Sequence, residues 1–157
     1  MERKRILITG CSTGIGRMAA VAFARRGYSV IAGVRHSAML ERFPVEGIRT
    51  LELDLSALAS VESAVDALAK EGLPDFVIHN AGVGVYGALE DLPRAAMEEQ
   101  FHANVFGVHQ LNQRLLPEMR SRGHGRIVIV TSVLGVVAMR GRGAYVASKF
   151  ALEGLAD

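Results

Sequence analysis

The sequence predicts a doubly wound α/β fold, in which helices cover both faces of a parallel sheet, and three observations support this. Short β-branched segments alternate along the 157 residues with longer amphipathic segments. The short segments are almost continuously apolar, as expected of parallel strands buried on both faces. Glycines also stand where the amphipathic segments are expected to end as helices. Such alternation favours one parallel sheet with right-handed crossovers.

Five short segments are expected to form the strands of this sheet. They are RILIT at 5–9, SVIAGV at 29–34, IRTLEL at 48–53, FVIHN at 76–80 and RIVIVTS at 126–132. We find no linker, internal repeat or low-complexity stretch between them. Residues 1–157 are therefore expected to form a single α/β domain.

Three stretches between the strands carry apolar residues at helical spacing. These residues are Ile15, Met18, Ala19, Ala22 and Phe23, then Val61, Ala64, Val65 and Leu68, then Phe101, Val105, Val108, Leu111, Leu115 and Met119. Gly27, Gly72 and Gly123 follow the three stretches and mark expected helix ends. The final stretch, YVASKFALEGLAD at 145–157, consists mostly of good helix formers.

Composition excludes several classes of function. Half of the residues are hydrophobic and 22% are charged, which is typical of a soluble globular protein. The formal charge of +2 is too small for a nucleic-acid footprint, and Trp is absent. The single cysteine, Cys11, permits no internal disulfide and fits a reducing cytoplasm. No apolar run resembles a signal peptide or a membrane span, so we expect a cytoplasmic protein with no nucleic-acid partner.

The segment TGCSTGIG at 9–16 joins the first expected strand to the first expected helix. Gly10 can permit a tight turn, while Gly14 and Gly16 let the backbone approach a ligand and the helix pack closely on the sheet. The start of the helix offers free N–H groups to a pyrophosphate. A dinucleotide is the expected ligand, and an ordinary tight turn is the alternative. Cys11 is expected to be a small filler of this loop.

The end of the second expected strand indicates which dinucleotide would bind. Sites for NAD usually place an acidic residue there, but this sequence reads AGVRH, with Arg35 and no carboxylate. A guanidinium suits the 2′-phosphate of NADP, and the Ser12 hydroxyl could bind it too. We therefore expect NADP(H) rather than NAD(H), with a plain surface arginine as the alternative. Asp54 could hold an adenine edge, or equally be the N-cap of the next helix.

Several polar residues are candidates for catalysis. Tyr145 and Lys149 are spaced to lie on one face of a helix, where an ammonium favours the phenolate and makes tyrosine a usable general acid and base. Ser132 is expected to end the fifth strand, and NAG at 80–82 to end the fourth, at the edge where doubly wound sheets bind ligands. Asn104 stands inside an otherwise regular expected helix. A polar surface residue is the alternative for Asn104.

Taken in order, these segments resemble the short-chain dehydrogenase/reductase family, which binds NAD(P) on a Rossmann fold. The matching features are TGCSTGIG, LELDL, NAG, Asn104, Ser132 and YVASK, and they span nearly the whole chain. The resemblance implies strand order 3-2-1-4-5 in the part present, with strands six and seven of the family missing. Within the family, NAGVGVYGALEDL and YVASKFALEGL are most similar to hydroxysteroid and retinol dehydrogenases.

The resemblance also implies roles for the matching residues. Tyr145 would exchange a proton with the substrate oxygen, Ser132 would hydrogen-bond that oxygen, and Lys149 would hold the nicotinamide ribose. Asn104 would keep a water in a proton relay that reaches Lys149. The cofactor would be bound by Gly10, Ser12, Gly14, Ile15, Gly16, Arg35, Asp54, Asn80 and Gly82, together with Tyr145 and Lys149.

The function implied is transfer of hydride between NADP(H) and a carbonyl or secondary alcohol, with an apolar substrate such as a steroid, a retinol or a ketone. Candidates for an apolar substrate wall are Val133, Leu134, Val136, Val137 and Met139, and the five histidines show no metal-ligand spacing. The intact enzyme is expected to be a homodimer or homotetramer, and the 157 residues alone are expected to show no turnover.

Two other functions stay open at this stage. One is a non-catalytic NADP-binding module or sensor, although such a protein would have no use for the proton donor Tyr145. The other is a nucleotide-sugar epimerase or dehydratase of the extended branch of the family. The spacing of Gly10, Gly14 and Gly16 argues against it, because that branch typically shortens the spacing by one residue.

Overall fold

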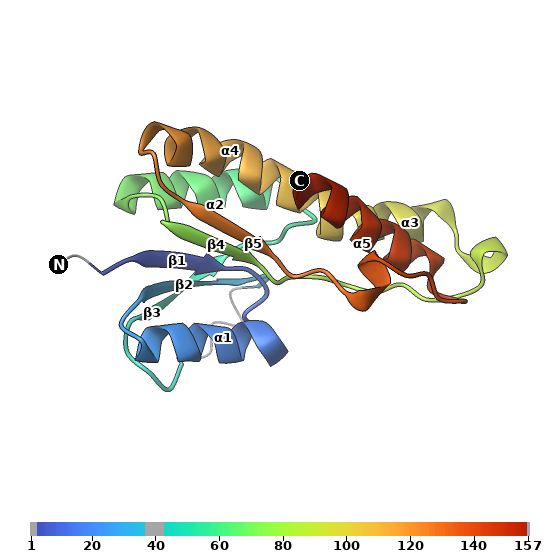
Figure 1. Cartoon of the computed structure of the whole chain (residues 1–157), viewed down its shortest axis with the longest axis horizontal. Helices are drawn as coiled ribbons and strands as arrows, with labels where there is room; N and C mark the ends of the chain where they lie inside the picture. Colours follow the sequence, from blue (N-terminus) through green and yellow to red (C-terminus); the bar gives the residue numbers. More distant parts are fainter. Residues whose placement is uncertain (1–2, 37–42, 157) are drawn as a thin grey trace.

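The computed structural model describes residues 3–36 and 43–156, which form a five-stranded parallel sheet in the order β3-β2-β1-β4-β5 (Figure 1). The strands are β1 (Arg5–Ile8), β2 (Ser29–Val34), β3 (Ile48–Glu52), β4 (Phe76–His79) and β5 (Arg126–Ile129). In the central strand, Leu7 pairs with Ile31 of β2 and with Val77 of β4. The predicted fold class and strand order are confirmed.

Helices cover both faces of the sheet, with α1 on one face and α2 and α4 on the other (Figure 1). The helices are α1 (Gly14–Arg25), α2 (Leu58–Glu71), α3 (Arg94–Phe101), α4 (Gly107–Ser121) and α5 (Gly143–Ala156), with short turns η2 (Leu89–Asp91), η3 (His102–Phe106) and η4 (Val133–Gly135). Gly27, Gly72 and Gly123 follow α1, α2 and α4 with positive φ, as predicted for helix ends. In the described part of the chain, no helix is both long and apolar enough to cross a membrane.

The hydrophobic core has two layers because successive residues of a strand point to opposite faces of the sheet. Leu7 faces α2 and α4, where it packs in a cluster with residues such as Leu68 and Leu111. Ile6 and Ile8 face the other way, into a cluster that includes Ala20 of α1. Burying one such Leu or Ile stabilises the fold by about 1.5–3 kcal/mol. The almost continuous apolar character of the strands is thus explained by burial on both faces.

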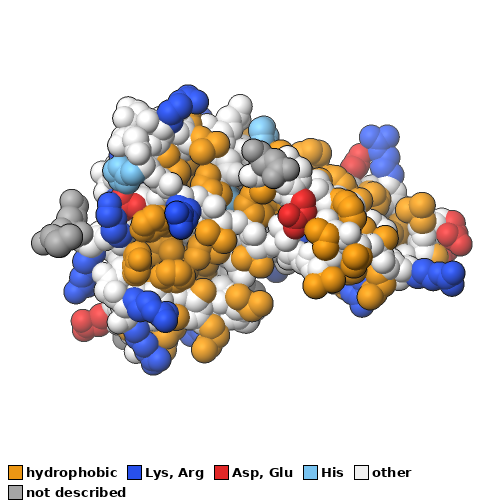
Figure 2. Space-filling view, viewed as in Figure 1, with side chains coloured by type: hydrophobic (Ala, Val, Ile, Leu, Met, Phe, Trp, Pro, Cys, Tyr) orange, Lys and Arg blue, Asp and Glu red, His pale blue; other side chains and the backbone are white. Residues whose placement is uncertain are grey.

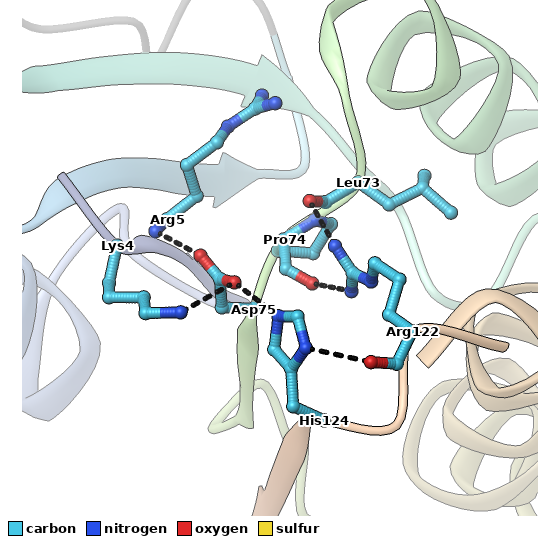
Figure 3. A network of polar contacts seen from close by, with 7 residues as sticks. All are labelled: Lys4, Arg5, Leu73, Pro74, Asp75, Arg122 and His124. Atoms are coloured by element: carbon cyan, nitrogen blue, oxygen red, sulfur yellow. Dashed lines mark hydrogen bonds and ion pairs between the residues drawn. The ribbon is translucent and has the colours of Figure 1, made fainter. Parts of the chain in front are cut away.

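A network of polar contacts centred on Asp75 ties together the amino end of the sheet (Figure 3). The Asp75 carboxylate accepts hydrogen bonds from the Arg5 backbone N–H at 2.8 Å, from Lys4 Nζ at 3.5 Å and from His124 Nε2 at 3.1 Å. Partial burial alone would raise the pKa of Asp75, but these hydrogen bonds and the Lys4 charge outweigh it and lower the pKa below its ordinary value. Asp75 therefore links β1, β4 and the turn before β5 as an ionised group.

Arg122 closes the same network from the end of α4. Its guanidinium donates to the carbonyl oxygens of Leu73 at 3.3 Å and Pro74 at 2.9 Å, just before β4 (Figure 3). The other ring nitrogen of His124 contacts the Arg122 carbonyl oxygen at 3.1 Å. Both ring nitrogens of His124 therefore face oxygen atoms of this network.

The fifth strand is shorter than predicted. It ends at Ile129 instead of Ser132, because β4 ends at His79 and the last paired residues are His79 and Ile129. Ser132 lies beyond the strand and caps η4, where its Oγ accepts a hydrogen bond from the Leu134 N–H at 3.1 Å. The prediction that Ser132 ends the strand is therefore wrong, although the residue stays at the carboxyl edge.

The expected regular helix around Asn104 is also interrupted. The segment from His102 to Phe106 is π-helical and connects α3 to α4. Such a π turn is often found at functional sites, where it re-aims one side chain within a helix. Asn104 is at the centre of this turn and is buried, so it is not a polar surface residue.

Candidate active site

A cavity of about 330 Å³ lies at the carboxyl end of the sheet, a volume within the usual range for small-molecule sites. Its walls come from the loops that follow β1, β2, β3 and β4, together with the start of α1, Glu99 of α3 and Ala103 of η3. Seven of the residues predicted to bind the cofactor line it, namely Gly10, Ser12, Ile15, Arg35, Asp54, Asn80 and Gly82. Gly14 and Gly16 are not in the wall.

Two glycines of the glycine loop, Gly10 and Gly16, are packed so closely that no side chain fits at either position. Gly10 has φ +72°, and a Cβ on it would lie 2.7 Å from the Ala81 Cα. A Cβ on Gly16 would overlap the carbonyl oxygen of Gly10. Gly16 therefore permits the start of α1 to pack against the loop, which is the packing role expected of it.

Thr9 and Asn80 fasten the glycine loop to the end of β4. The Thr9 Oγ1 accepts the backbone N–H of Asn80 at 3.1 Å and that of Ala81 at 3.0 Å. In return, Asn80 Nδ2 donates to the carbonyl oxygens of Thr9 at 3.0 Å and Gly10 at 3.2 Å. Sequence analysis missed Thr9, whose signal is a polar residue at the end of an apolar strand. Asn80 thus both lines the cavity and shapes the loop that forms its floor.

Cys11 is a buried member of the same loop. Its Sγ donates to the Ile8 carbonyl oxygen at 3.1 Å, and burial raises the pKa of the thiol to about 12. A thiol with so high a pKa is not a nucleophile at neutral pH. The prediction that Cys11 fills the loop is confirmed.

Asp54 lies in the cavity wall, but it is not a helix cap. Its carboxylate accepts hydrogen bonds from the Ser56 N–H at 2.9 Å and the Ser56 hydroxyl at 2.7 Å, which form a turn. The N-cap residue of α2 is Ala57, three residues later. The alternative that Asp54 caps the helix is therefore wrong, because a short loop separates β3 from α2.

Lys149 lies beside Tyr145 on α5, as their spacing predicted. Its Nζ is 5.6 Å from the centroid of the Tyr145 ring and donates to the Val130 carbonyl oxygen at 3.0 Å. The side chain is buried, and this burial lowers the pKa of Lys149 below its ordinary value. The Lys149 amine is thus held at a fixed position next to the Tyr145 ring.

Asn104 uses its side-chain amide to join a loop to α5. Its Oδ1 accepts the Val83 N–H at 2.9 Å, and its Nδ2 donates to the Val83 carbonyl oxygen at 2.9 Å and to Ser148 Oγ at 3.1 Å. Ser148 Oγ in turn donates to the Tyr145 carbonyl oxygen at 2.8 Å. Both hydrogens of the amide are therefore engaged within the protein. Sequence analysis missed Ser148, although it stands inside YVASK.

Gly82 is the point where the cavity meets α5. It lines the cavity, and a Cβ on it would lie 3.6 Å from both Asn104 Oδ1 and Lys149 Nζ. The cavity that the predicted cofactor residues line is therefore adjacent to Asn104 and Lys149, two of the four predicted catalytic residues. This juxtaposition joins segments that are up to about 140 residues apart in the sequence.

An aromatic and apolar surface surrounds Tyr145. Tyr86 packs edge-on against it, with ring centroids 5.9 Å apart, and the Arg142 guanidinium covers the Tyr86 ring at 4.0 Å. Figure 2 shows hydrophobic side chains gathered over the region of η4 and α5. The exposed residues in these elements and beside them include Val133, Val136, Val137, Met139 and Phe150. Sequence analysis missed Tyr86 and Arg142.

A family profile described as short chain dehydrogenase matches residues 4–157. The chain belongs to the short-chain dehydrogenase family. It is 47% identical over 158 residues to the uncharacterized oxidoreductase YbbO of Escherichia coli K12, and the match covers 99% of this chain and 58% of the relative. It is 39% identical to bovine (Bos taurus) retinol dehydrogenase 8, over 96% of this chain and 51% of the relative. It is 37% identical to human (Homo sapiens) 17-beta-hydroxysteroid dehydrogenase type 1, over 100% of this chain and 51% of the relative.

Two solved structures of dehydrogenases have the same fold as this chain. A short-chain dehydrogenase from Streptomyces avermitilis superimposes with a TM-score of 0.91 at 34% identity, over 98% of this chain and 58% of that protein. A gluconate 5-dehydrogenase from Burkholderia cenocepacia, in complex with NADP and tartrate, superimposes with a TM-score of 0.89 at 28% identity, over 99% of this chain and 64% of that protein. The chain thus spans between half and two thirds of the length of these proteins.

Proposed function

We propose that residues 1–157 form the NAD(P)-binding domain of an oxidoreductase that transfers hydride between NADP(H) and a carbonyl or secondary alcohol. The observation that carries the proposal is the contact at Gly82, where the cavity adjoins Asn104 and Lys149, with Tyr145 beside Lys149. A pure binding module would need the cavity but not the buried lysine next to a tyrosine.

The residues of the cavity suit a dinucleotide phosphate. Gly10 closes a turn that leaves room for a pyrophosphate, and Ser12 and Arg35 in the wall offer a hydroxyl and a guanidinium to a 2′-phosphate. The residues that follow β2 directly are Arg35 and His36, so neither of them is a carboxylate that would favour an unphosphorylated ribose. Asp54 and Gly82 would lie along the adenosine and the ribose. The bound cofactor would supply the hydride, and the protein the proton and the orientation.

Tyr145 would move the proton at the substrate oxygen. The Lys149 ammonium would stabilise its phenolate, and Lys149 would also bind the nicotinamide ribose. Ser132 accepts a hydrogen bond through its lone pair, so its own hydrogen stays available to donate to the substrate oxygen and stabilise charge there. Because the Asn104 amide is already engaged, any relay water at this residue would be held by the backbone of the π turn.

The substrate would be apolar. Val133, Val136, Val137 and Met139 expose apolar side chains next to the catalytic helix, and two relatives are named for retinol and a hydroxysteroid. We further propose that the intact protein works in the cytoplasm as a homodimer or homotetramer.

The test is a screen of ketones, aldehydes and retinoids with the complete enzyme, at the length of its relatives, followed by NADPH absorbance at 340 nm. We expect NADPH-dependent reduction of at least one apolar carbonyl compound, and oxidation of the corresponding alcohol with NADP⁺. The Tyr145→Phe variant is the control that separates this activity from a contaminant. No cofactor oxidation with any of the compounds would contradict the proposal.

A further inference from the structure

Gln100 is a buried polar residue at the end of α3 that the mechanism above does not use. Its side chain is fully enclosed, one helical turn before Asn104. Its Oε1 accepts the Val85 N–H at 2.7 Å, and its Nε2 donates to the Val83 carbonyl oxygen at 2.6 Å. Burying an amide is costly unless its polar atoms are bonded, and here both are bonded.

The backbone from Val83 to Val85 belongs to no helix or strand. Two amide side chains bind its polar groups in place of a neighbouring strand. Asn104 accepts a hydrogen bond from the Val83 N–H and donates one to the Val83 carbonyl oxygen. Gln100 donates to the same carbonyl oxygen and accepts a hydrogen bond from the Val85 N–H. The position of this segment is therefore set by Gln100 and Asn104 together.

Both ends of the segment carry groups of the candidate site. Gly82, immediately before it, separates the cavity from Lys149. Tyr86, immediately after it, packs on the Tyr145 ring. A displacement of the segment would move the cavity wall and the neighbour of the proton donor at once.

We propose that Gln100 is a positioning residue for the reaction, which holds the segment 83–85 and, through the Val83 carbonyl, the amide of Asn104. It thereby sets Gly82 and Tyr86 relative to Lys149 and Tyr145. A bonded chain then runs from Gln100 through Val83, Asn104 and Ser148 to the backbone of Tyr145. The proposal rests on the proposed function, because it assigns Gln100 to the same reaction.

The test uses Gln100→Met in the complete enzyme, since methionine has a similar length and fills irregular space without hydrogen bonds. Gln113→Met makes the same change at an exposed position of α4. Val61→Ala removes buried volume from α2, which makes no hydrogen bond to the segment in the described part of the chain, and serves as a control for lost stability. Three quantities are measured. They are kcat per titrated NADPH site, KM, and the rate of hydrogen exchange of the Val85 amide.

For Gln100→Met we expect kcat to fall about 10–100-fold, because small misplacements of reacting groups cost this much. The KM should change less than about threefold. The Val85 amide should exchange at least about fivefold faster, since its acceptor is lost. Gln113→Met and Val61→Ala should keep kcat per site within about twofold and leave Val85 protection unchanged relative to global stability.

A kcat of Gln100→Met within twofold of the parent enzyme would overturn the proposal, whatever the Val85 amide does. An equal fall of kcat per site in Val61→Ala would overturn it too, since Gln100 would then act only through stability. A parent enzyme with no NADPH-dependent turnover would refute the proposed function and this inference with it. The two failures are distinguishable, because the first leaves an active parent enzyme.

Discussion

The two ends of the sheet use similar polar residues in opposite ways. At the amino end, the Asp75 carboxylate is surrounded by donors from Lys4, Arg5 and His124, so its negative charge is balanced by contacts within the protein (Figure 3). At the carboxyl end, Arg35 and Asp54 line an open cavity, where their charge remains accessible to a ligand. The comparison indicates that the amino end is built for stability and the carboxyl end for binding.

Two histidines at the two ends of the sheet also differ in their surroundings. His124, at the amino end, is half exposed and contacts an oxygen with each ring nitrogen. His79 ends β4, is buried, and meets Asn112 Oδ1 at 2.6 Å through Nε2, while its Nδ1 has no partner among the described residues. Burial lowers the pKa of His79 to about 4, although the Asn112 contact opposes this. Substitutions in the carboxyl-end active site and in the Asp75 network should separate catalysis from stability, whereas His79 acts on stability although it lies at the carboxyl end.

The largest expected effect is on turnover at the carboxyl end. Tyr145→Phe removes only the phenol oxygen and should lower kcat by about 10²–10⁴-fold, the usual contribution of a positioned acid or base. Its NADPH affinity and its unfolding free energy should stay nearly unchanged. Lys149→Ala should damage both turnover and NADPH binding, because the lysine has two roles. Steady-state kinetics and cofactor titration of the two variants measure the difference, and near-normal turnover of Tyr145→Phe would refute the mechanism.

The next effect is a loss of stability in mild acid caused by His79. The folded-state pKa of about 4 lies below the ordinary value of 6.5, so between these values only the unfolded chain binds the proton. The free energy of unfolding should therefore fall by about 3 kcal/mol as the pH drops from about 6.5 to about 4. Above pH 6.5 this contribution is fully present.

Denaturant titrations of the complete enzyme at several pH values test the role of His79. His79→Gln keeps a donor for Asn112 but cannot titrate, so its curve should lose most of the slope between pH 6.5 and 4. His109→Gln, at an exposed position of α4, should keep the slope of the parent. The same acid sensitivity in His79→Gln would assign the effect to other groups.

A smaller effect is expected from Asp75 at the amino end. Asp75→Ala removes the acceptor of the Arg5 N–H and should lower the free energy of unfolding by about 1–2 kcal/mol, because the contacts with Lys4 and His124 are partly exposed and contribute little. NADPH affinity and kcat per site should not change. Thermal unfolding and cofactor titration measure the two quantities, and a loss of cofactor binding at full stability would break the separation between the two ends.

Much of the fold could be predicted from the sequence because the signals were local. Continuous apolar runs identified all five strands, and Gly27, Gly72 and Gly123 marked the ends of α1, α2 and α4. Strand ends were less certain, since Val130 is as suitable for a strand as Ile129. The strand ends where its partner β4 ends, which is a tertiary property.

The parts of the candidate site that lie in short sequence motifs could be predicted. The glycine loop, NAG and YVASK placed the cavity and the helix that adjoins it. The bonds of Gln100 and Asn104, including the one from Asn104 to Ser148, join residues 15 to 44 positions apart in the sequence, which no local spacing encodes. Thr9 and Tyr86 look ordinary in the sequence because their partners come from other segments.

The most direct test of the account is the cofactor preference of Arg35→Asp, since it requires no knowledge of the substrate. Arg26→Asp makes the same charge change at an exposed position after α1, at the other end of the sheet, and is the control. Calorimetric titration of the complete enzyme should show NADPH binding more tightly than NADH. Arg35→Asp should weaken NADPH binding by about 10–150-fold, the range for loss of a charged hydrogen bond, and leave NADH binding equal or stronger. An unchanged preference in Arg35→Asp, or an equal loss in Arg26→Asp, would contradict an NADP site in this cavity.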